Sequence, residues 1–275
     1  MYTFIDSIDD LAFLNEELLK KPYVGVDTEF RRTTKDNMRL ALLQINDGEE
    51  IFIIDPLKID SPAQQTSFLF DNDVTKILHS CKEDLEAIYS WTHKKMQNVF
   101  DTQLANSFLE DEYSVSYQNL VEKKLAIVLD KGETRSNWLR RPLSDSQLKY
   151  AALDVEYLIN IYFEQEKELS LSNKLSWLKE DVEKLIDFTL HSQGNPEESP
   201  RTLPKAQENE LLQRFNTLIQ QVALREGINV TLFFSKKAQK EFLRKVLIYG
   251  VEAAFDNETD WRKELLIEDL ISLLK

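Results

Sequence analysis

The sequence predicts an α/β protein, with a mixed β-sheet flanked by helices and followed by a smaller, all-helical domain. A strong hairpin signal, Asp47-Gly48, joins two apolar runs early in the chain. Strands and helices then alternate, and a hairpin followed by such alternation is typical of a mixed sheet. After residue 206 there is no convincing strand signal. We therefore expect only helices in that part of the chain.

Apolar periodicity places the elements of the sheet domain. Strands are expected at residues 2–5, 23–30, 39–45, 51–56, 74–80 and 98–102. Helices are expected at residues 7–21, 62–71, 82–91, 102–109, 144–170 and 174–190. Ser7 is the predicted N-cap of the first helix, and Ser144 or Asp145 that of the long one.

A linker is predicted at "HSQGNPEESPRTLPKA", residues 191–206. This segment holds three prolines, a glycine and several polar residues, without apolar periodicity. It divides the chain into a first domain, residues 1–190, and a helical domain, residues 207–275.

The composition, 42% hydrophobic and 30% charged, is that of a soluble globular protein. No apolar run approaches the ~20 residues that span a bilayer, and the acidic start "MYTFIDSIDD" does not resemble a signal peptide. The single cysteine, Cys81, excludes an internal disulfide and fits a reducing compartment. We expect a cytoplasmic protein with no membrane partner.

The net charge of −14 is unevenly distributed. Residues 201–275 hold 12 Lys+Arg and 11 Asp+Glu, whereas the remaining 22 Lys+Arg and 37 Asp+Glu lie in residues 1–200. Phosphate binding normally needs a basic face. However, the acidity belongs to the first domain, where part of it can serve as metal ligands, so overall charge does not exclude a nucleic-acid partner.

At three places in the sequence, the expected local structure brings acidic side chains to one face of an element or to the start of a helix. Asp27 and Glu29 follow an apolar run and face one side of a strand, Asp84 lies just inside a helix, and Tyr150 and Asp154 share a face of the long helix. Each has a structural alternative: a solvated strand end, acids favoured by a helix dipole, or a half-buried tyrosine beside a surface acid. No single motif is specific, so their combination carries the prediction.

Four carboxylates, with His79 as the only nearby candidate nitrogen and no cysteine cluster, describe an oxygen-ligand site. Such a site suits Mg²⁺ or Mn²⁺ rather than structural zinc. Two ions ~3.5–4 Å apart can activate water and stabilise a leaving oxygen. They also make an acidic pocket accept phosphate.

Five segments in order resemble the motifs of the ribonuclease D family, which belongs to the tyrosine subgroup of DEDD 3′–5′ exonucleases. They are "VDTEF", "LHSCKEDLEAI", "FDTQLANSFL", "LDKGETRSNWLRRPLS" and "YAALDVEYL". The resemblance covers roughly residues 20–165. It implies an RNase H-like fold and a 3′–5′ exonuclease domain at residues 1–190. It also implies that two divalent ions are held by Asp27, Glu29, Asp84 and Asp154, with Tyr150 as the family tyrosine.

By this resemblance we expect a metal-dependent exoribonuclease that trims RNA 3′ ends, with tRNA precursors as substrate, and that releases nucleoside 5′-monophosphates. No obligate protein partner is inferred. Two alternatives stay open: the same chemistry on DNA, and a non-catalytic RNA-binding protein on the same fold.

Tyr150 is expected to orient the attacking hydroxide by a hydrogen bond. Its reference pKa near 10 makes it a poor base at neutral pH, and the metal lowers the pKa of its own water. We therefore expect an orienting role first and a basic role second.

Candidate substrate contacts surround these acids. In residues 130–144, Lys131, Arg135, Arg140 and Arg141 flank Trp138, either as a wall that grips phosphates or as a solvated loop. Phe30 is expected near the terminal base or in the core. His79 touches substrate or satisfies a core hydrogen bond, with the structural role favoured. Asp101 is interpreted as an N-cap rather than a fifth ligand.

The C-terminal region resembles the start of an HRDC module, a small helical nucleic-acid-binding domain. The likeness lies in residues 211–245, with a long helix, the "REGINVTLFFS" turn and a second helix opening at Ser235. Lys236, Lys240 and Arg244 follow at i, i+4 and i+8, which predicts a basic stripe for RNA binding or a solvated face. The acidic "VEAAFDNETD" beyond it departs from the family pattern.

Overall fold

The fold is described from a computed structural model. It describes residues 2–34, 37–60, 62–110, 112–129, 136–191 and 199–275. The strands are β1 (Tyr2–Ile5), β2 (Tyr23–Thr34), β3 (Asn37–Asn46), β4 (Ile51–Ile54), β5 (Thr75–Leu78) and β6 (Val99–Asp101).

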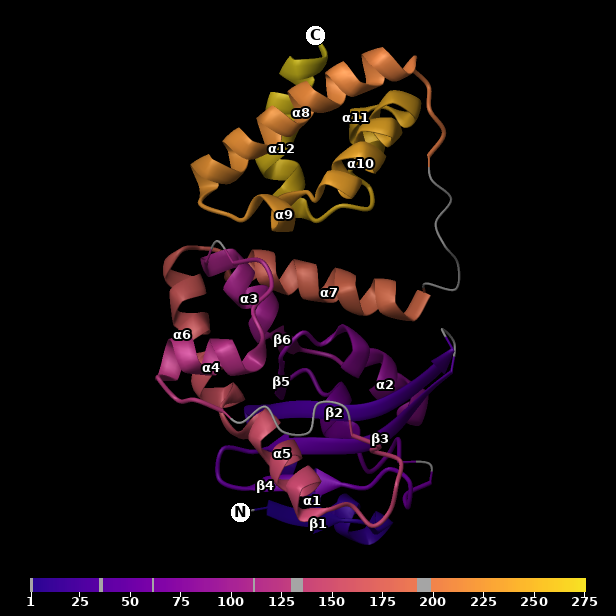
Figure 1. The fold of residues 1–275 in the computed structure, drawn as a ribbon, viewed down its shortest axis with the longest axis vertical. Helices are drawn as coiled ribbons and strands as arrows, with labels where there is room; N and C mark the ends of the chain where they lie inside the picture. The colour runs from indigo at the N-terminus through magenta and orange to yellow at the C-terminus, as the bar shows by residue number, and fades with distance from the viewer. Residues whose placement is uncertain (1, 35–36, 61, 111, 130–135, 192–198) are drawn as a thin grey trace.

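One sheet contains these strands in the order β1-β4-β3-β2-β5-β6 (Figure 1). β3 pairs antiparallel with β2 and β4, and the other pairs are parallel. The predicted mixed sheet is confirmed. Gly48, with φ of 91°, occupies the turn between β3 and β4, a backbone conformation that favours glycine. β2 is longer than predicted and runs to Thr34.

The helices before the predicted linker are α1 (Ile8–Leu18), α2 (Lys82–Thr92), α3 (Thr102–Leu109), α4 (Tyr117–Leu125), α5 (Asp145–Glu156), α6 (Leu158–Leu171) and α7 (Leu175–His191), with a short 3₁₀ helix, η1 (Ser67–Phe70). Ser7 and Ser144 are N-caps as predicted, and Ser144 forms a capping box with Gln147. The helix expected at 62–71 was wrong, because only the η1 turn forms. The Asn15 side chain accepts the Phe68 N–H (3.1 Å) and so ties this turn to α1. α4 was not predicted.

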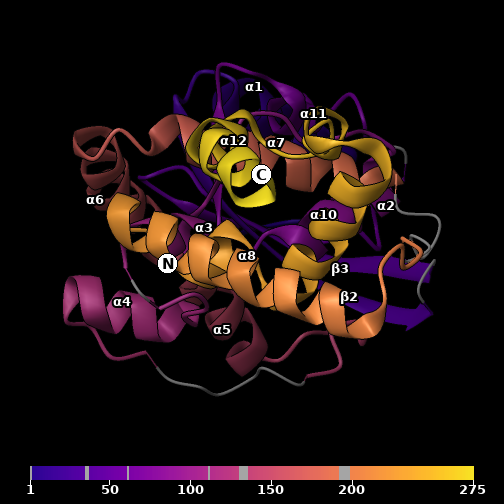
Figure 2. The same ribbon diagram turned by 90° about the horizontal axis from the view of Figure 1, so that it is seen from above.

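The two faces of the sheet are covered by different helices (Figure 2). On one face, Leu43 and Ile45 of β3 belong to the large core that also contains the buried leucines of α1 and α2. On the other face, Leu42 packs with Ile53 and with Ala151 of α5 in a smaller cluster. The alternation of side chains along a strand produces this division, and it places α5 over the face that carries Asp27.

The long helix predicted at 144–170 is two helices, α5 and α6, separated at Tyr157. The cause is Tyr117 of α4. Its hydroxyl donates to the Leu153 carbonyl (3.2 Å) and accepts the Tyr157 N–H (3.0 Å). It thereby replaces the i→i−4 bond between those two groups, and a side chain inserted in this way breaks a helix. The break follows Asp154 by only three residues.

The C-terminal region consists of α8 (Lys205–Glu226), α9 (Val230–Phe233), α10 (Lys236–Tyr249), α11 (Val251–Ala254) and α12 (Asp260–Leu274). The all-helical expectation is confirmed, and Ser235 caps α10 as predicted. α8 begins at Lys205, inside the predicted linker, and the domain division stays a prediction. These helices lie against α7 (Figure 1), where Trp261 stacks on Trp177 with ring centroids 5.1 Å apart. Within the described residues, no helix is both long and apolar enough to cross a membrane.

Candidate active site

The first two carboxylates project from a stretch of β2 with one open edge. β5 pairs with β2 only from Tyr23 to Gly25. Beyond Gly25 the chain of β5 turns away into α2, so the edge of β2 next to Asp27 and Glu29 is free of that strand. Both side chains are half-buried. The expected pair therefore lies at the end of a buried strand, where other elements can approach it.

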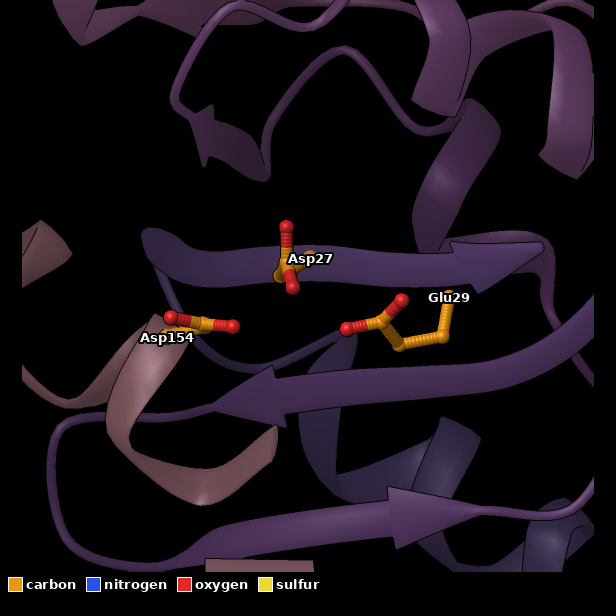
Figure 3. Close-up of side chains that lie close together, drawn as sticks. All are labelled: Asp27, Glu29 and Asp154. Atoms are coloured by element: carbon orange, nitrogen blue, oxygen red, sulfur yellow. The ribbon is translucent and has the colours of Figure 1, made fainter. Parts of the chain in front are cut away.

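Asp154 reaches the pair from α5. The junction of α5 and α6 lies very close to β2, since a Cβ at Gly25 would be 3.3 Å from Leu158 Cβ and 3.4 Å from the Val155 carbonyl oxygen. Carboxylate oxygens of Asp27, Glu29 and Asp154 lie within 4.8 Å of one another. Figure 3 shows the three side chains converging from strand and helix.

Asp84 of α2 lies beside this group. It is 7% exposed, and its carboxylate accepts a hydrogen bond from the Thr28 hydroxyl. Its oxygens do not belong to the group of carboxylate oxygens that lie within 4.8 Å of one another. Its charge nevertheless raises the pKa of both Asp27 and Glu29. Asp84 is thus a close neighbour of these three carboxylates rather than one of the converging set.

Tyr150 and Trp138 complete the wall of the site. Tyr150 lies beside Asp154 and opposes the burial that raises the pKa of that carboxyl, and its ring lies 6.1 Å from the Trp138 ring. The Trp138 indole, which can only donate, opposes the rise in the pKa of Glu29 in the same way. Trp138 is buried beside a carboxylate, and its contact with substrate stays a prediction.

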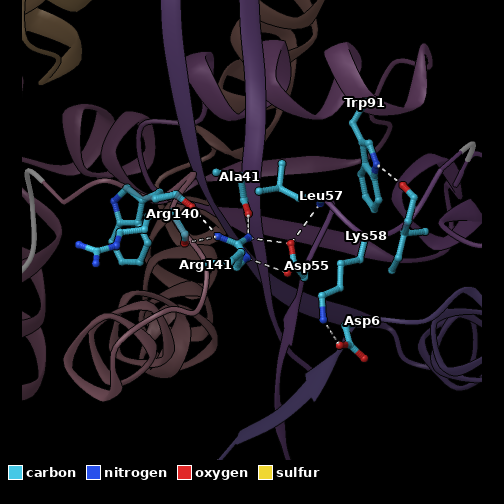
Figure 4. Close-up of polar contacts among 10 residues, drawn as sticks. Asp6, Ala41, Asp55, Leu57, Lys58, Trp91, Arg140 and Arg141 are labelled. Atoms are coloured by element: carbon cyan, nitrogen blue, oxygen red, sulfur yellow. Dashed lines mark hydrogen bonds and ion pairs between the residues drawn. The ribbon is translucent and has the colours of Figure 1, made fainter.

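Arg141 does not join a phosphate-gripping wall. Its guanidinium makes two bonds to the fully buried Asp55, of 2.7 and 2.6 Å, and donates to the carbonyls of Trp138 (2.7 Å) and Ala41 (2.8 Å). Figure 4 shows it turned inward onto the sheet. A buried carboxylate strongly favours such a bidentate partner. This pair fixes the segment that carries Trp138.

Burial raises the pKa of all four carboxyls, and repulsion between neighbouring acids adds to it at Asp27 and Glu29. The pKa of Asp27 lies well above its usual range, first because of burial and then because of Asp154, Asp84 and Glu29. Burial, followed by the charges of Asp154 and Asp84, raises the pKa of Glu29 to about 9. Burial raises the pKa of Asp84 and of Asp154 to about 7. Burial and these acids also raise the pKa of Tyr150, which makes it a still poorer base.

A divalent cation fits these residues. The converging donors are all oxygen, the ligand type that Mg²⁺ and Mn²⁺ prefer. None of the described lysine or arginine side chains forms an ion pair with the four acids. A cation would therefore remove the repulsion that raises their pKa values.

A pocket of about 370 Å³ opens next to Glu29. It is lined by Phe30, Arg31, Ser136, Asn137, Trp138 and Leu139. Phe30 is half-buried: it packs against the core and lines this pocket, and its contact with the terminal base stays a prediction. The neighbouring candidates Lys131 and Arg135 lie outside the described residues.

His79 has the structural role that was favoured. Its Nδ1 lies 2.9 Å from the Thr102 hydroxyl and its Nε2 lies 3.0 Å from the Val115 carbonyl oxygen. Asp101 is the N-cap of α3, and its carboxylate also accepts the N–H groups of Ser80 and Cys81. These two residues hold the start of α2, and with it Asp84, in place.

The expected basic stripe on α10 is only partly present. Lys236 is exposed and Lys240 half-buried, whereas Arg244 is buried and donates to Glu208 (2.6 Å). Arg244 is therefore a structural residue rather than part of an RNA-facing stripe. Lys240 lines a groove of about 1210 Å³ between α7 and α10, together with three other lysines and several carboxylates.

Three residues that shape the site could not be recognised from the sequence. Tyr117 breaks the helix after Asp154, Thr28 binds Asp84, and Asn46 donates to the Val155 carbonyl (3.0 Å) at the end of α5. Asp55, the buried partner of Arg141, could have been recognised, because it is an acid directly after an apolar strand.

Comparison with known proteins agrees with this geometry. A family model described as 3′–5′ exonuclease matches residues 2–170. A ribonuclease D from Xanthomonas oryzae is 42% identical over 181 residues, which are 65% of this chain and 50% of that protein. The chain thus spans about half the length of the curated relatives it matches.

Solved structures give the same result. The crystal structure of Escherichia coli RNase D, titled as an exoribonuclease in structured RNA processing, has a TM-score of 0.67 and 27% identity, over 100% of this chain and 74% of that one. Brucella melitensis NrnC with bound Mg²⁺ shares the fold, with a TM-score of 0.56 and 21% identity over 71% of this chain and 96% of that one. With the family model covering more than half of its length, the chain belongs to the 3′–5′ exonuclease family.

Proposed function

We propose that this protein is a metal-dependent 3′–5′ exoribonuclease that trims RNA 3′ ends, tRNA precursors included. The observation that carries the proposal is the convergence of Asp27, Glu29 and Asp154, with Asp84 beside them and without a cationic partner among the described residues. The similarity to ribonuclease D proteins favours RNA over DNA.

In this reaction water attacks the last phosphodiester, the bond from phosphorus to the 3′ oxygen breaks, and that oxygen takes up a proton. The products are a nucleoside 5′-monophosphate and an RNA shortened by one residue. Two bound divalent ions would supply activation of water near neutral pH and stabilisation of the leaving oxygen. Asp27, Glu29 and Asp154 would hold the first ion, and Asp84 would help to hold the second.

The remaining residues position the reactants. Tyr150, kept protonated by its raised pKa, donates its one O–H to Asp154 and orients the attacking water by accepting a hydrogen bond from it. Trp138 holds the Glu29 carboxylate. The pocket between Phe30 and Trp138 seats the nucleotide that is removed. Lys236 and Lys240 are proposed to contact the RNA backbone further from the cleaved bond.

The deciding experiment compares labelled RNA and DNA strands of one sequence, each with a free or a blocked 3′ end. We expect Mg²⁺- or Mn²⁺-dependent release of mononucleotides from the free RNA end, and none with EDTA. Asp27→Asn should abolish release, whereas the exposed control Asp9→Asn should not. Faster degradation of DNA would favour the first alternative. Binding of RNA without cleavage would favour a non-catalytic protein.

A further inference from the structure

Gln44 of β3 occupies a position beside the acidic triad. Its Cα is paired with that of Asp27 on β2 and with that of Ile53 on β4. Directly paired residues of neighbouring strands project to the same face of a sheet. The Gln44 side chain therefore lies on the face that carries Asp27, beneath α5.

This side chain is fully buried and lacks polar partners. Its exposure is 0%, and neither the amide nitrogen nor the amide oxygen has a hydrogen-bond partner among the described residues. Its other neighbours on that face, Leu42 and Ile53, are apolar. A buried polar group without a partner costs its full desolvation, so a leucine at this position would favour folding more than the glutamine does. Such a group needs an explanation outside the fold itself.

We propose that Gln44 is a positioning residue for Asp27. When Asp27 holds a cation, the Gln44 amide N–H donates a hydrogen bond to the carboxylate, directly or through one water. The proposal rests on the proposed function. A ligating carboxylate keeps free lone pairs, and such ligands are commonly held by an outer hydrogen bond. A neutral amide can orient the Asp27 carboxylate without neutralising its negative charge. A lysine at this position would compete with the cation for that charge.

The test compares Gln44→Leu with a matched control, Gln165→Leu. Gln165 is also a fully buried glutamine with an unpartnered oxygen among the described residues, but it lies in α6, where its nitrogen donates to the Thr102 carbonyl (2.9 Å). Calorimetric titration of the metal-free full chain with Mn²⁺ measures affinity, and urea unfolding measures stability.

We expect Gln44→Leu to weaken Mn²⁺ binding by roughly 10–100-fold, the usual effect of losing an outer-sphere partner, and not to lower stability without metal. Gln165→Leu should leave Mn²⁺ affinity unchanged. Gln44→Met serves as a second variant if the branched leucine disturbs packing.

Unchanged Mn²⁺ affinity in folded Gln44→Leu or Gln44→Met would overturn the role of Gln44 and leave the proposed metal site intact. An absence of saturable Mn²⁺ binding in the wild-type chain would overturn both. An equal loss of affinity in Gln165→Leu would show a general packing effect and would also overturn the proposal.

Discussion

Asp181 and Glu208 are buried carboxylates with arginine partners, whereas the four acids at the end of β2 have none among the described side chains. Arg262 reaches across from α12 and binds both oxygens of Asp181 on α7. Arg244 and Arg201 donate to the two oxygens of Glu208, at 2.6 and 2.7 Å. Arg244 accordingly holds the pKa of Glu208 below its usual value.

At the site the reverse holds. Burial raises the pKa values of Asp27, Glu29 and Asp84, and the charges of neighbouring carboxylates raise them further. In one region the charges are satisfied by the chain and serve folding. In the other they lack an internal partner, because the partner that they suit is a cation from solution. The presence or absence of a cationic partner therefore distinguishes structural carboxylates from functional ones more clearly than burial alone.

The largest expected effect is on stability, at the carboxylates that have arginine partners. Arg262→Met should lower the free energy of unfolding by about 3–5 kcal/mol, because it leaves Asp181 buried without its cation. The matched control is Arg225→Met, whose pairs with Glu226 and Asp269 are exposed and should contribute less than about 1 kcal/mol. Urea unfolding monitored by circular dichroism measures both. Equal effects would mean that the two kinds of pair do not differ.

On the functional side, Tyr150→Phe removes the hydroxyl but keeps the ring. We expect the maximal rate of RNA cleavage to fall by about 10²-fold, with Mn²⁺ affinity nearly unchanged, because Tyr150 orients and does not ligate. Tyr162→Phe, in an aromatic cluster with Tyr23 and Phe163, is the control. A wild-type rate in Tyr150→Phe would contradict the orienting role.

Replacing the unpaired carboxyl of Glu29 by a neutral amide should stabilise the metal-free protein. The pKa of Glu29 is about 9 in the fold, against a reference value of 4.5. At pH 6 Glu29 is therefore protonated when folded and ionised when unfolded, a cost of about 2 kcal/mol that Glu29→Gln removes. Chemical unfolding in EDTA measures this gain. The exposed Glu168→Gln should show no gain, and a loss of stability in Glu29→Gln would refute the unpaired-charge interpretation.

The smallest expected change, counted for one pH unit, is the pH slope of that gain. The folded protein binds more protons at Glu29 than the unfolded chain does, so stability without metal falls as pH rises from about 4.5 to about 9. The advantage of Glu29→Gln should therefore grow by about 1.4 kcal/mol for each pH unit between pH 5 and 8. Unfolding curves in EDTA at several pH values measure it. A pH-independent difference would show that the pKa of Glu29 is not raised.

Much of the fold was open to prediction because its signals are local. The Asp47-Gly48 turn, the serine caps at Ser7 and Ser144, and the apolar run of β3 each depend on near neighbours. The break at Tyr157 was missed because a tyrosine forty positions away causes it. The buried roles of Arg141 and Arg244 were missed for a similar reason, since a basic side chain looks the same in sequence whether it faces solvent or a buried acid.

The sequence by itself determined which side chains are proposed to carry the chemistry. Asp27, Glu29, Asp84, Tyr150 and Asp154 were identified by their order and their local elements. Only the tertiary structure decided how they are held: Trp138 against Glu29, Arg141 on Asp55, and Gln44 buried beside Asp27. The physical reason is that residue type and spacing determine what a side chain can do. Its partners depend on packing between strands and helices that lie far apart in the chain.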